Sequence, residues 1–244
     1  MHFEINFYLD EFLITLNINN KNVYKKLSNF FSSQKNNFSY KKNLEIFIDC
    51  NLKKCKIYTK KITKFIVLNK KNKKNLTNMI LWVIIYFVQD FLAPYGYLFI
   101  HASSFFYKKD GYLFIGSPGS GKSTIISNLP HSNLLSNDIA IIKRKKGDFF
   151  IQTNFFEKNK LKIKKINLVN LKKIFFIKKS KVLKTKRISK KLAIINLIKN
   201  LCSVTIGFRI NKDVYKILFL MLKKPIFYLF FPKKFSFNQF KKIL

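Results

Sequence analysis

One short segment constrains the fold of this chain more than any other. Residues 116–123 read Gly-Ser-Pro-Gly-Ser-Gly-Lys-Ser and match the pattern G-x-x-x-x-G-K-[ST] of a phosphate-binding loop, or P-loop. An apolar strand candidate at residues 112–115 precedes the motif and a helix candidate at 124–129 follows it, which is the context that the motif requires. Glycine is scarce, with 7 residues in 244, yet three glycines fall in this loop. The motif therefore predicts an α/β chain organised around a strand–loop–helix unit.

The residue types in the motif explain how it would hold a nucleotide. Its glycines let the backbone wrap so that successive N–H groups point at phosphate oxygens, and the following helix presents its N-terminus to the same anion. Lys122 would reach the β- and γ-phosphates, and the Ser123 hydroxyl would ligate Mg²⁺. The expected cofactors are therefore Mg²⁺ and ATP or GTP. The expected nucleotide-binding residues are Gly116, Ser117, Pro118, Gly119, Ser120, Gly121, Lys122, Ser123 and Thr124.

A metal-bound nucleotide also calls for a carboxylate, and few acidic residues follow the loop. Asp138 lies beside a strand candidate at residues 139–142 and is favoured as a metal ligand, with a turn or capping aspartate as the alternative. Glu157 is a second candidate metal ligand, but a glutamate on the surface is the favoured interpretation. His101, in the apolar run 97–105, is expected to face the loop from a neighbouring strand, either as a catalytic or as a packing histidine.

Three segments resemble, in this order, the C-terminal domain of HPr serine kinase/phosphorylase and its stand-alone relatives. They are Phe-Ile-His-Ala-Ser at residues 99–103, the P-loop strand and motif at 112–124, and Leu-Leu-Ser-Asn-Asp at 134–138. The relatives share a His-Ala-Ser strand, a short turn, a P-loop strand and a Ser-Asp-Asp segment. Residues 171–177, 189–201 and 225–232 are similar to later strands and a helix of the family, so the resemblance covers roughly residues 97–244.

The resemblance implies an α/β P-loop nucleotide-binding fold of the HPr kinase and phosphoenolpyruvate carboxykinase type. It implies phosphoryl transfer from a Mg²⁺-nucleotide to a serine of a protein or peptide partner that the sequence does not identify. His101, Lys122 and Asp138 are the implied catalytic residues, with Ser123 and Asp138 as metal ligands. Asn137 stands where the relatives have the first acid of their pair. A nucleotide-binding regulatory module with an eroded active site is therefore the alternative function.

The expected organisation is a small β-rich N-terminal lobe at residues 1–93 and a P-loop domain at residues 94–244. In the lobe, residues 3–17 read as one or two strands, residues 45–58 and 62–68 as two more, and residues 77–92 as a buried helix. The P-loop domain adds strands at 97–105, 149–153, 172–178 and 225–231 and a helix at 189–201 capped by Ser189. The apolar run 79–88 is shorter than the roughly 20 residues of a membrane helix, so no transmembrane segment is expected.

The charge of the chain is extreme, with 48 basic and 11 acidic residues and a net charge of +37. Such a chain attracts nucleic acid and anionic membranes without a specific site. Specific readout of bases and phosphates favours arginine, and the chain has only Arg144, Arg187 and Arg209. No specific nucleic-acid partner is expected, although a basic membrane- or RNA-associated protein remains a third alternative. Three scattered arginines also exclude the arginine-rich lid of small-molecule nucleotide kinases.

The cysteines and histidines predict neither a disulfide framework nor a metal centre. Cys50, Cys55 and Cys202 form an odd count with no C-x-x-C pair, which fits a reduced, cytoplasmic compartment. The histidines, at positions 2, 101 and 131, are too widely spaced to suggest a shared metal.

Overall fold

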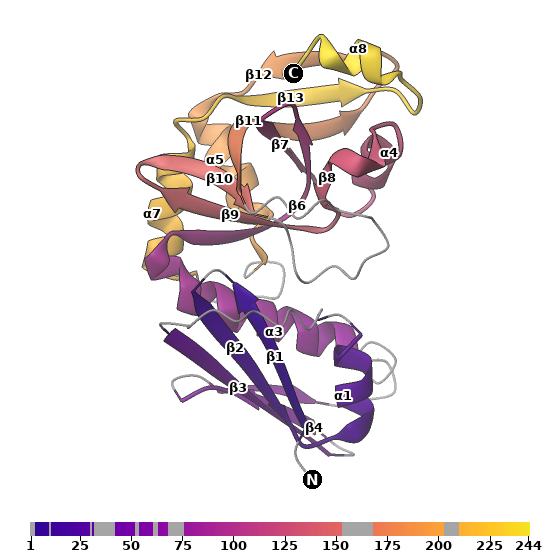
Figure 1. The fold of residues 1–244 in the computed structure, drawn as a ribbon. Helices are drawn as coiled ribbons and strands as arrows, with labels where there is room; N and C mark the ends of the chain where they lie inside the picture. Colours follow the sequence, from indigo (N-terminus) through magenta and orange to yellow (C-terminus); the bar gives the residue numbers. More distant parts are fainter. Residues whose placement is uncertain are drawn as a thin grey trace. The chain divides into compact units, whose positions relative to one another are not determined.

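The computed structural model is a mixed α/β protein with two β-sheets, one in each of two compact units (Figure 1). The units are Met1–Phe91 and Leu92–Leu244, whereas the sequence placed the boundary after residue 93. The structure describes residues 3–9, 11–29, 31, 42–51, 54–60, 63–67, 76–152, 168–202 and 210–244.

The N-terminal unit contains a five-stranded sheet in the order β1-β2-β3-β4-β5. Its strands are β1 (Phe3–Leu9), β2 (Phe12–Ile18), β3 (Lys42–Cys50), β4 (Lys54–Tyr58) and β5 (Thr63–Val67). Strands β2 and β3 are parallel, and the other neighbours are antiparallel. In β1, Ile5, Phe7 and Leu9 are buried and alternate with more exposed residues, as a strand with one face on a core requires. The expected strand at 45–58 is in fact two strands, β3 and β4, because the Asn51 side chain accepts the Lys54 amide and turns the chain.

A disulfide joins the two strands of this hairpin, which corrects the expectation of unpaired cysteines. Cys50 and Cys55 lie directly opposite each other in the β3–β4 pair, with their Cα atoms 4.1 Å apart. Cysteine count and spacing did not reveal the pair, because the two residues become neighbours only when the turn between them forms. Cys202 is a buried free thiol in the C-terminal unit, and burial raises its pKa.

In the described part of the N-terminal unit, helices α1 (Lys21–Leu27) and α3 (Leu76–Leu92) accompany the sheet. The sequence analysis missed α1, whose first backbone amides are capped by the Asn20 side chain. Helix α3, close to the expected 77–92, lies across one face of the sheet (Figure 1). Together with the short η1 turn (Ala93–Tyr95), it gives a stretch of 20 residues that has the length and apolar composition of a membrane span, with mean hydropathy 1.6. The sequence-based expectation used only the shorter run 79–88. Of that stretch's apolar window, 56% is buried inside the structure, as in a core helix.

The C-terminal unit contains an eight-stranded sheet that curls back on itself. The strand order is β10-β9-β6-β7-β11-β13-β12, while β8 pairs with β6 and β10 also pairs with the start of β11. Strands β7, β11 and β13 are parallel neighbours, so their carboxyl ends lie at the same edge. The strands are β6 (Tyr97–Tyr107), β7 (Asp110–Ile115), β8 (Leu134–Ser136), β9 (Ile139–Lys145), β10 (Asp148–Gln152), β11 (Leu168–Lys179), β12 (Lys184–Arg187) and β13 (Ile226–Phe231).

Apolar cores cover both faces of this sheet, and each packs against helices among the described residues. In β7, Leu113 and Ile115 enter the core that contains α5 (Lys190–Lys199) and α7 (Lys212–Met221). Tyr112 and Phe114 enter the opposite core, which contains α4 (Lys122–Ser127) and α8 (Phe237–Lys241). The expected cap of α5 is confirmed, because the Ser189 side chain accepts the Leu192 amide. Strand β12 and helices α7 and α8 were not foreseen.

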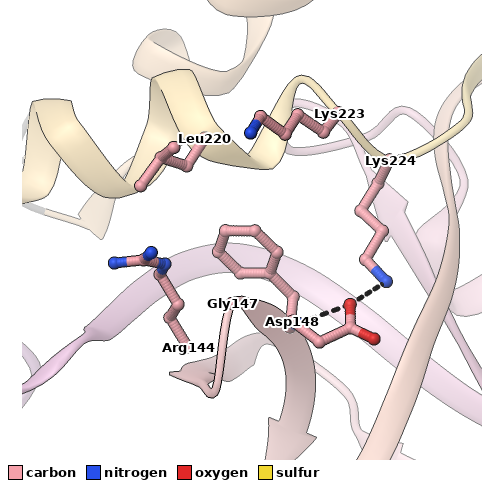
Figure 2. Close-up of a pocket in the computed structure, with 7 residues that line it drawn as sticks. Arg144, Gly147, Asp148, Leu220, Lys223 and Lys224 are labelled. Atoms are coloured by element: carbon pink, nitrogen blue, oxygen red, sulfur yellow. Dashed lines mark hydrogen bonds and ion pairs between the residues drawn. The ribbon is translucent and has the colours of Figure 1, made fainter.

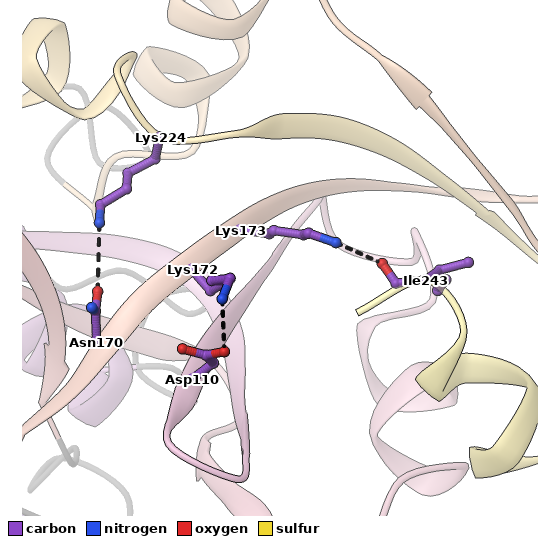
Figure 3. Close-up of polar contacts among 6 residues, drawn as sticks. All are labelled: Asp110, Asn170, Lys172, Lys173, Lys224 and Ile243. Carbon is purple, nitrogen blue, oxygen red and sulfur yellow. Dashed lines mark hydrogen bonds and ion pairs between the residues drawn. The ribbon is translucent and has the colours of Figure 1, made fainter.

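Lysines of β11 make polar contacts with the start of β7 and with the C-terminal residues (Figure 3). The Lys172 ammonium lies 3.0 Å from the Asp110 carboxylate at the start of β7. Lys173 Nζ donates to the Ile243 carbonyl at 3.1 Å, and burial, followed by the charge of Lys172, lowers the pKa of Lys173. Exposed ion pairs add little stability. These contacts instead favour one register of β11 against its neighbours.

Candidate functional site

The glycine-rich motif forms a loop between β7 and α4, and residues 116–121 are called the glycine loop here. As expected, a strand precedes the loop and a helix follows it, although the helix spans Lys122–Ser127 rather than 124–129. The Ser120 amide bonds the Ser117 carbonyl at 3.1 Å and closes a turn. Gly119 (φ +78°) and Gly121 (φ +103°) adopt left-handed conformations that glycine tolerates best. Because α4 has only six residues, the loop amides and Lys122 are the stronger features for holding an anion.

Neighbouring side chains press against two of the loop glycines. A β-carbon on Gly121 would lie 2.6 Å from Cζ of Phe231, and one on Gly116 would lie 2.8 Å from Cγ1 of Ile177. Distances below 3.0 Å would force a shift of these neighbours. The atom nearest to a β-carbon on Gly116 would be Ser120 Oγ of the loop itself, so this serine, β11 and β13 together crowd the two positions.

The Lys122 side chain folds back onto the glycine loop. Its ammonium donates to the Gly116 carbonyl at 2.6 Å and makes a longer contact of 3.4 Å with the Ser117 carbonyl. Only 8% of the residue is exposed. Burial lowers the pKa of Lys122, while the nearby Asp138 carboxylate acts in the opposite direction. The loop therefore holds a cation that is only partly neutralised.

Strand pairing brings His101 and Asp138 to the same end of β7. Ala102 pairs with Ile115, the last residue of β7, and His101 pairs with Ile139 at the start of β9. The Ala102 amide also bonds the Asp138 carbonyl at 3.0 Å. His101 thus lies in β6, between the strand that leads into the glycine loop and the strand that follows Asp138.

The charges of Lys122 and Asp138 both act on the pKa of His101. Burial is the main cause that lowers the pKa of His101, and the Lys122 charge lowers it further, whereas Asp138 raises it. His101 is half-buried and Asp138 is exposed. Strand pairing therefore sets His101 and the Asp138 segment beside the end of β7, where the loop that leads to Lys122 begins, and burial lowers the pKa of His101.

Sequence reasoning missed the serines that fasten the Asp138 segment to β6. Ser103 Oγ donates to the Asn137 carbonyl, and Ser104 Oγ lies 2.6 Å from Ser136 Oγ. Ser103, Ser104 and Ser136 are completely buried. Two adjacent serines inside the apolar run 97–105 were the available signal, because buried hydroxyl groups need partners.

The side chains expected to hold Mg²⁺ are a hydroxyl and a carboxylate. Ser123 and Asp138 are both exposed. Mg²⁺ takes oxygen ligands and commonly combines one or two protein oxygens with phosphates and water, so this donor set fits the ion. Within the described ranges, no group of three or more His, Cys, Asp and Glu side chains could hold a metal by itself. Glu157, the second candidate, lies outside the described residues.

A cavity of about 310 Å³ lies elsewhere in the C-terminal unit (Figure 2). It is bounded by the β9–β10 turn and the end of α7, and sequence reasoning gave no hint of it. Its lining residues are Arg144, Gly147, Asp148, Phe149, Leu220, Lys223 and Lys224. Lys224 forms an ion pair with Asp148, and this contact holds the pKa of Asp148 below its ordinary value. The cavity includes no residue of the glycine loop.

Comparison with known proteins gives fold-level similarity only. No protein-family model matches the chain, and no curated protein matches it either. Among solved structures, the HPr(Ser) kinase/phosphatase from Coxiella burnetii is similar at 11% identity, over 59% of this chain and 97% of that chain. The TM-score of 0.32 makes this a weak similarity of fold, and the functional argument rests on the site itself.

Proposed function

We propose that the protein binds a Mg²⁺-nucleotide at the glycine loop and transfers its terminal phosphoryl group to a serine of a protein or peptide. The observation that carries this proposal is the Lys122 ammonium bound to the glycine loop at the end of β7, where strand pairing also sets His101 and the Asp138 segment. A buried cation, an exposed carboxylate and a half-buried imidazole around one glycine-rich turn suit phosphate binding and phosphate chemistry. The motif resemblance to HPr kinases supports serine as the acceptor class.

Each residue then has a role that follows from its chemistry. Lys122 exchanges the Gly116 carbonyl for phosphate oxygens, to which the loop amides also donate. Ser123 and Asp138 hold Mg²⁺, which neutralises phosphate charge when it is bound. His101 has a lowered pKa and is mostly neutral at pH 7, so it offers one N–H donor to the phosphate or the acceptor. Phosphoryl transfer depends mainly on such positioning and charge neutralisation.

A second candidate function is a regulatory module that binds nucleotide without transferring phosphate. The observation that favours it is Asn137, which lies beside Asp138 and whose amide side chain cannot accept a proton from a serine hydroxyl. Both candidates require nucleotide binding at the glycine loop. They differ in whether the γ-phosphate leaves the nucleotide.

Calorimetric titration with Mg²⁺-ATP and Mg²⁺-GTP tests the shared part of both candidates. We expect metal-dependent binding that weakens at least about 10-fold in Lys122→Ala and in Asp138→Ala, since each removes a charged contact. Lys216→Ala, on the exposed surface of α7, is the control for loss of one positive charge and should bind like wild type. No binding by the wild type would overturn the proposal.

Transfer is tested with γ-labelled ATP and arrayed serine-containing peptides. Label on a peptide serine, lost in Lys122→Ala, supports the kinase. Nucleotide binding with neither peptide labelling nor γ-phosphate release supports the regulatory module. A purely charge-driven RNA or membrane association would instead collapse at high salt and be insensitive to Lys122→Ala.

A further inference from the structure

We infer that Lys179, at the end of β11, is a second phosphate-binding lysine of the glycine loop and contacts the same polyphosphate as Lys122. This inference rests on the proposed function and deepens it, because the pattern G-x-x-x-x-G-K-[ST] contains no residue of β11.

The strand register places Lys179 at the level of the glycine loop. Strand β11 runs parallel to β7, and their last pair is Phe176 with Ile115. There β7 ends and the chain enters the loop, whereas β11 continues for three more residues to Lys179. Pairing with Phe231 and a 2.8 Å bond from the Ser180 amide to the Phe231 carbonyl hold this end of β11 in place. Open α/β sheets bind ligands outside the carboxyl ends of their parallel strands.

Side-chain alternation directs Lys179, but not its neighbour, toward the loop. Ile177 lies in the core that contains α4 and approaches Gly116, and Lys179 shares its face of the strand. Lys178 projects from the opposite face, where its ammonium lies 4.1 Å from the centroid of the Tyr228 ring. The Tyr228 hydroxyl in turn contacts Asn196 of α5, on that same opposite side.

The Lys179 stem reaches the glycine that precedes Lys122. Its Cε lies 3.5 Å from where a β-carbon on Gly121 would stand, and Cε is one bond from the ammonium. The Lys179 side chain is exposed and makes no ion pair or hydrogen bond with any residue that the structure describes. The Lys122 side chain therefore contacts the loop from the start of α4, and the Lys179 side chain contacts it from the end of β11.

A second observation is that a serine hydroxyl of the loop has no hydrogen-bond acceptor among the described residues. Ser120 Oγ is buried and has no hydrogen-bond partner among the described residues. An unsatisfied buried hydroxyl is costly, and a phosphate oxygen bound by the loop would supply its acceptor.

Because the chain has only three arginines, a second cationic contact to phosphate would have to come mainly from lysine. Arg144 lines the cavity at the β9–β10 turn and Arg187 lies in the exposed edge strand β12, while Arg209 lies outside the described residues. Among the described cations, Lys179 is placed to provide the second charged contact that arginine often provides to phosphates.

Titration of the full-length chain with inorganic tripolyphosphate and with Mg²⁺-ATP tests the inference. We expect Lys179→Gln to weaken both affinities about 10-fold, since a charged hydrogen bond is lost, and to reduce their salt dependence. Lys178→Gln is the matched control, because it removes the same charge from the adjacent residue on the other face. It should change either affinity less than about 2-fold. Lys179→Arg should retain affinity closer to wild type, because it keeps the charge.

The possible failures are distinguishable. Equal weakening in Lys178→Gln and Lys179→Gln would overturn the inference in favour of a diffuse charge effect. Wild-type affinity in Lys179→Gln would overturn it while leaving the proposed function intact. Absence of binding by the wild-type chain would overturn both. Thermal unfolding of the two glutamine variants shows whether they remain folded, and a destabilised Lys179→Gln is replaced by Lys179→Met, which keeps the aliphatic stem and carries the same expectation.

Discussion

Ser104 and Ser136 share a hydroxyl–hydroxyl hydrogen bond of 2.6 Å in the interior of the C-terminal unit. The bond ties β8 to β6, and the adjacent Ser103 bonds the Asn137 carbonyl. Through these contacts the segment that ends in Asp138 is fixed beside the strand that carries His101. The geometry of the candidate site therefore depends on buried serines that lie outside the glycine loop in the sequence.

The first prediction concerns this serine pair. Ser136→Ala leaves the Ser104 hydroxyl buried without its partner, so we expect the free energy of unfolding to fall by about 1–3 kcal/mol in urea denaturation. The Ser104→Ala/Ser136→Ala double variant removes both groups and should cost less than the sum of the single variants. Strict additivity of the two single effects would contradict the pairing.

Gly121 is predicted to be essential to the shape of the loop. Gly121→Ala places a β-carbon at φ +103° and against the Phe231 ring, so we expect a loss of stability of about 2 kcal/mol or more and weaker Mg²⁺-ATP binding. Thermal unfolding and calorimetry measure the two effects. Gly147→Ala is the control, because Gly147 also has a positive φ of +86° but nothing within 4 Å of the added carbon. A stability loss no larger than that of the control would mean that Phe231 does not crowd the loop.

The lowered pKa of His101 should make the stability of the protein depend on pH. Its pKa in the folded protein is lowered from the ordinary 6.5, chiefly by burial and then by Lys122, so the unfolded chain binds the proton more readily. Stability is therefore retained above pH 6.5 and is lost as the pH falls from there toward the lower folded pKa. Urea denaturation between pH 5 and 8 should show a smaller loss on acidification in His101→Gln than in wild type. A His101→Gln profile parallel to that of wild type would refute the assignment.

Thiol chemistry should separate the three cysteines. Burial raises the pKa of Cys202, and Cys50 is bonded to Cys55, so the native oxidised chain should not react with a thiol reagent. Unfolding without reductant should expose one thiol per chain, and unfolding after reduction should expose three. Cys202→Ala should remove the first signal. Three thiols before reduction would show that the hairpin cysteines are unpaired.

Local sequence signals predicted many elements of the fold but not all of them. Alternating apolar residues located β1 and β2, and the capping serine located the start of α5. Strand β12 was not predicted because its four residues are all exposed and none is apolar, so no apolar periodicity marks it. The β3–β4 hairpin was read as one strand, since a turn built on the Asn51 side chain leaves no glycine or proline signal.

The sequence by itself determined where the glycine loop lies, because its glycines, Lys122 and Ser123 are contiguous and need only a strand before them and a helix after them. Tertiary structure alone decided which other residues lie beside the loop. Long-range strand pairing sets His101 between β7 and β9, and parallel pairing carries Lys179 to the same edge. A one-residue change of register would reverse the face of each strand side chain, and register depends on the packing of two cores rather than on any local motif.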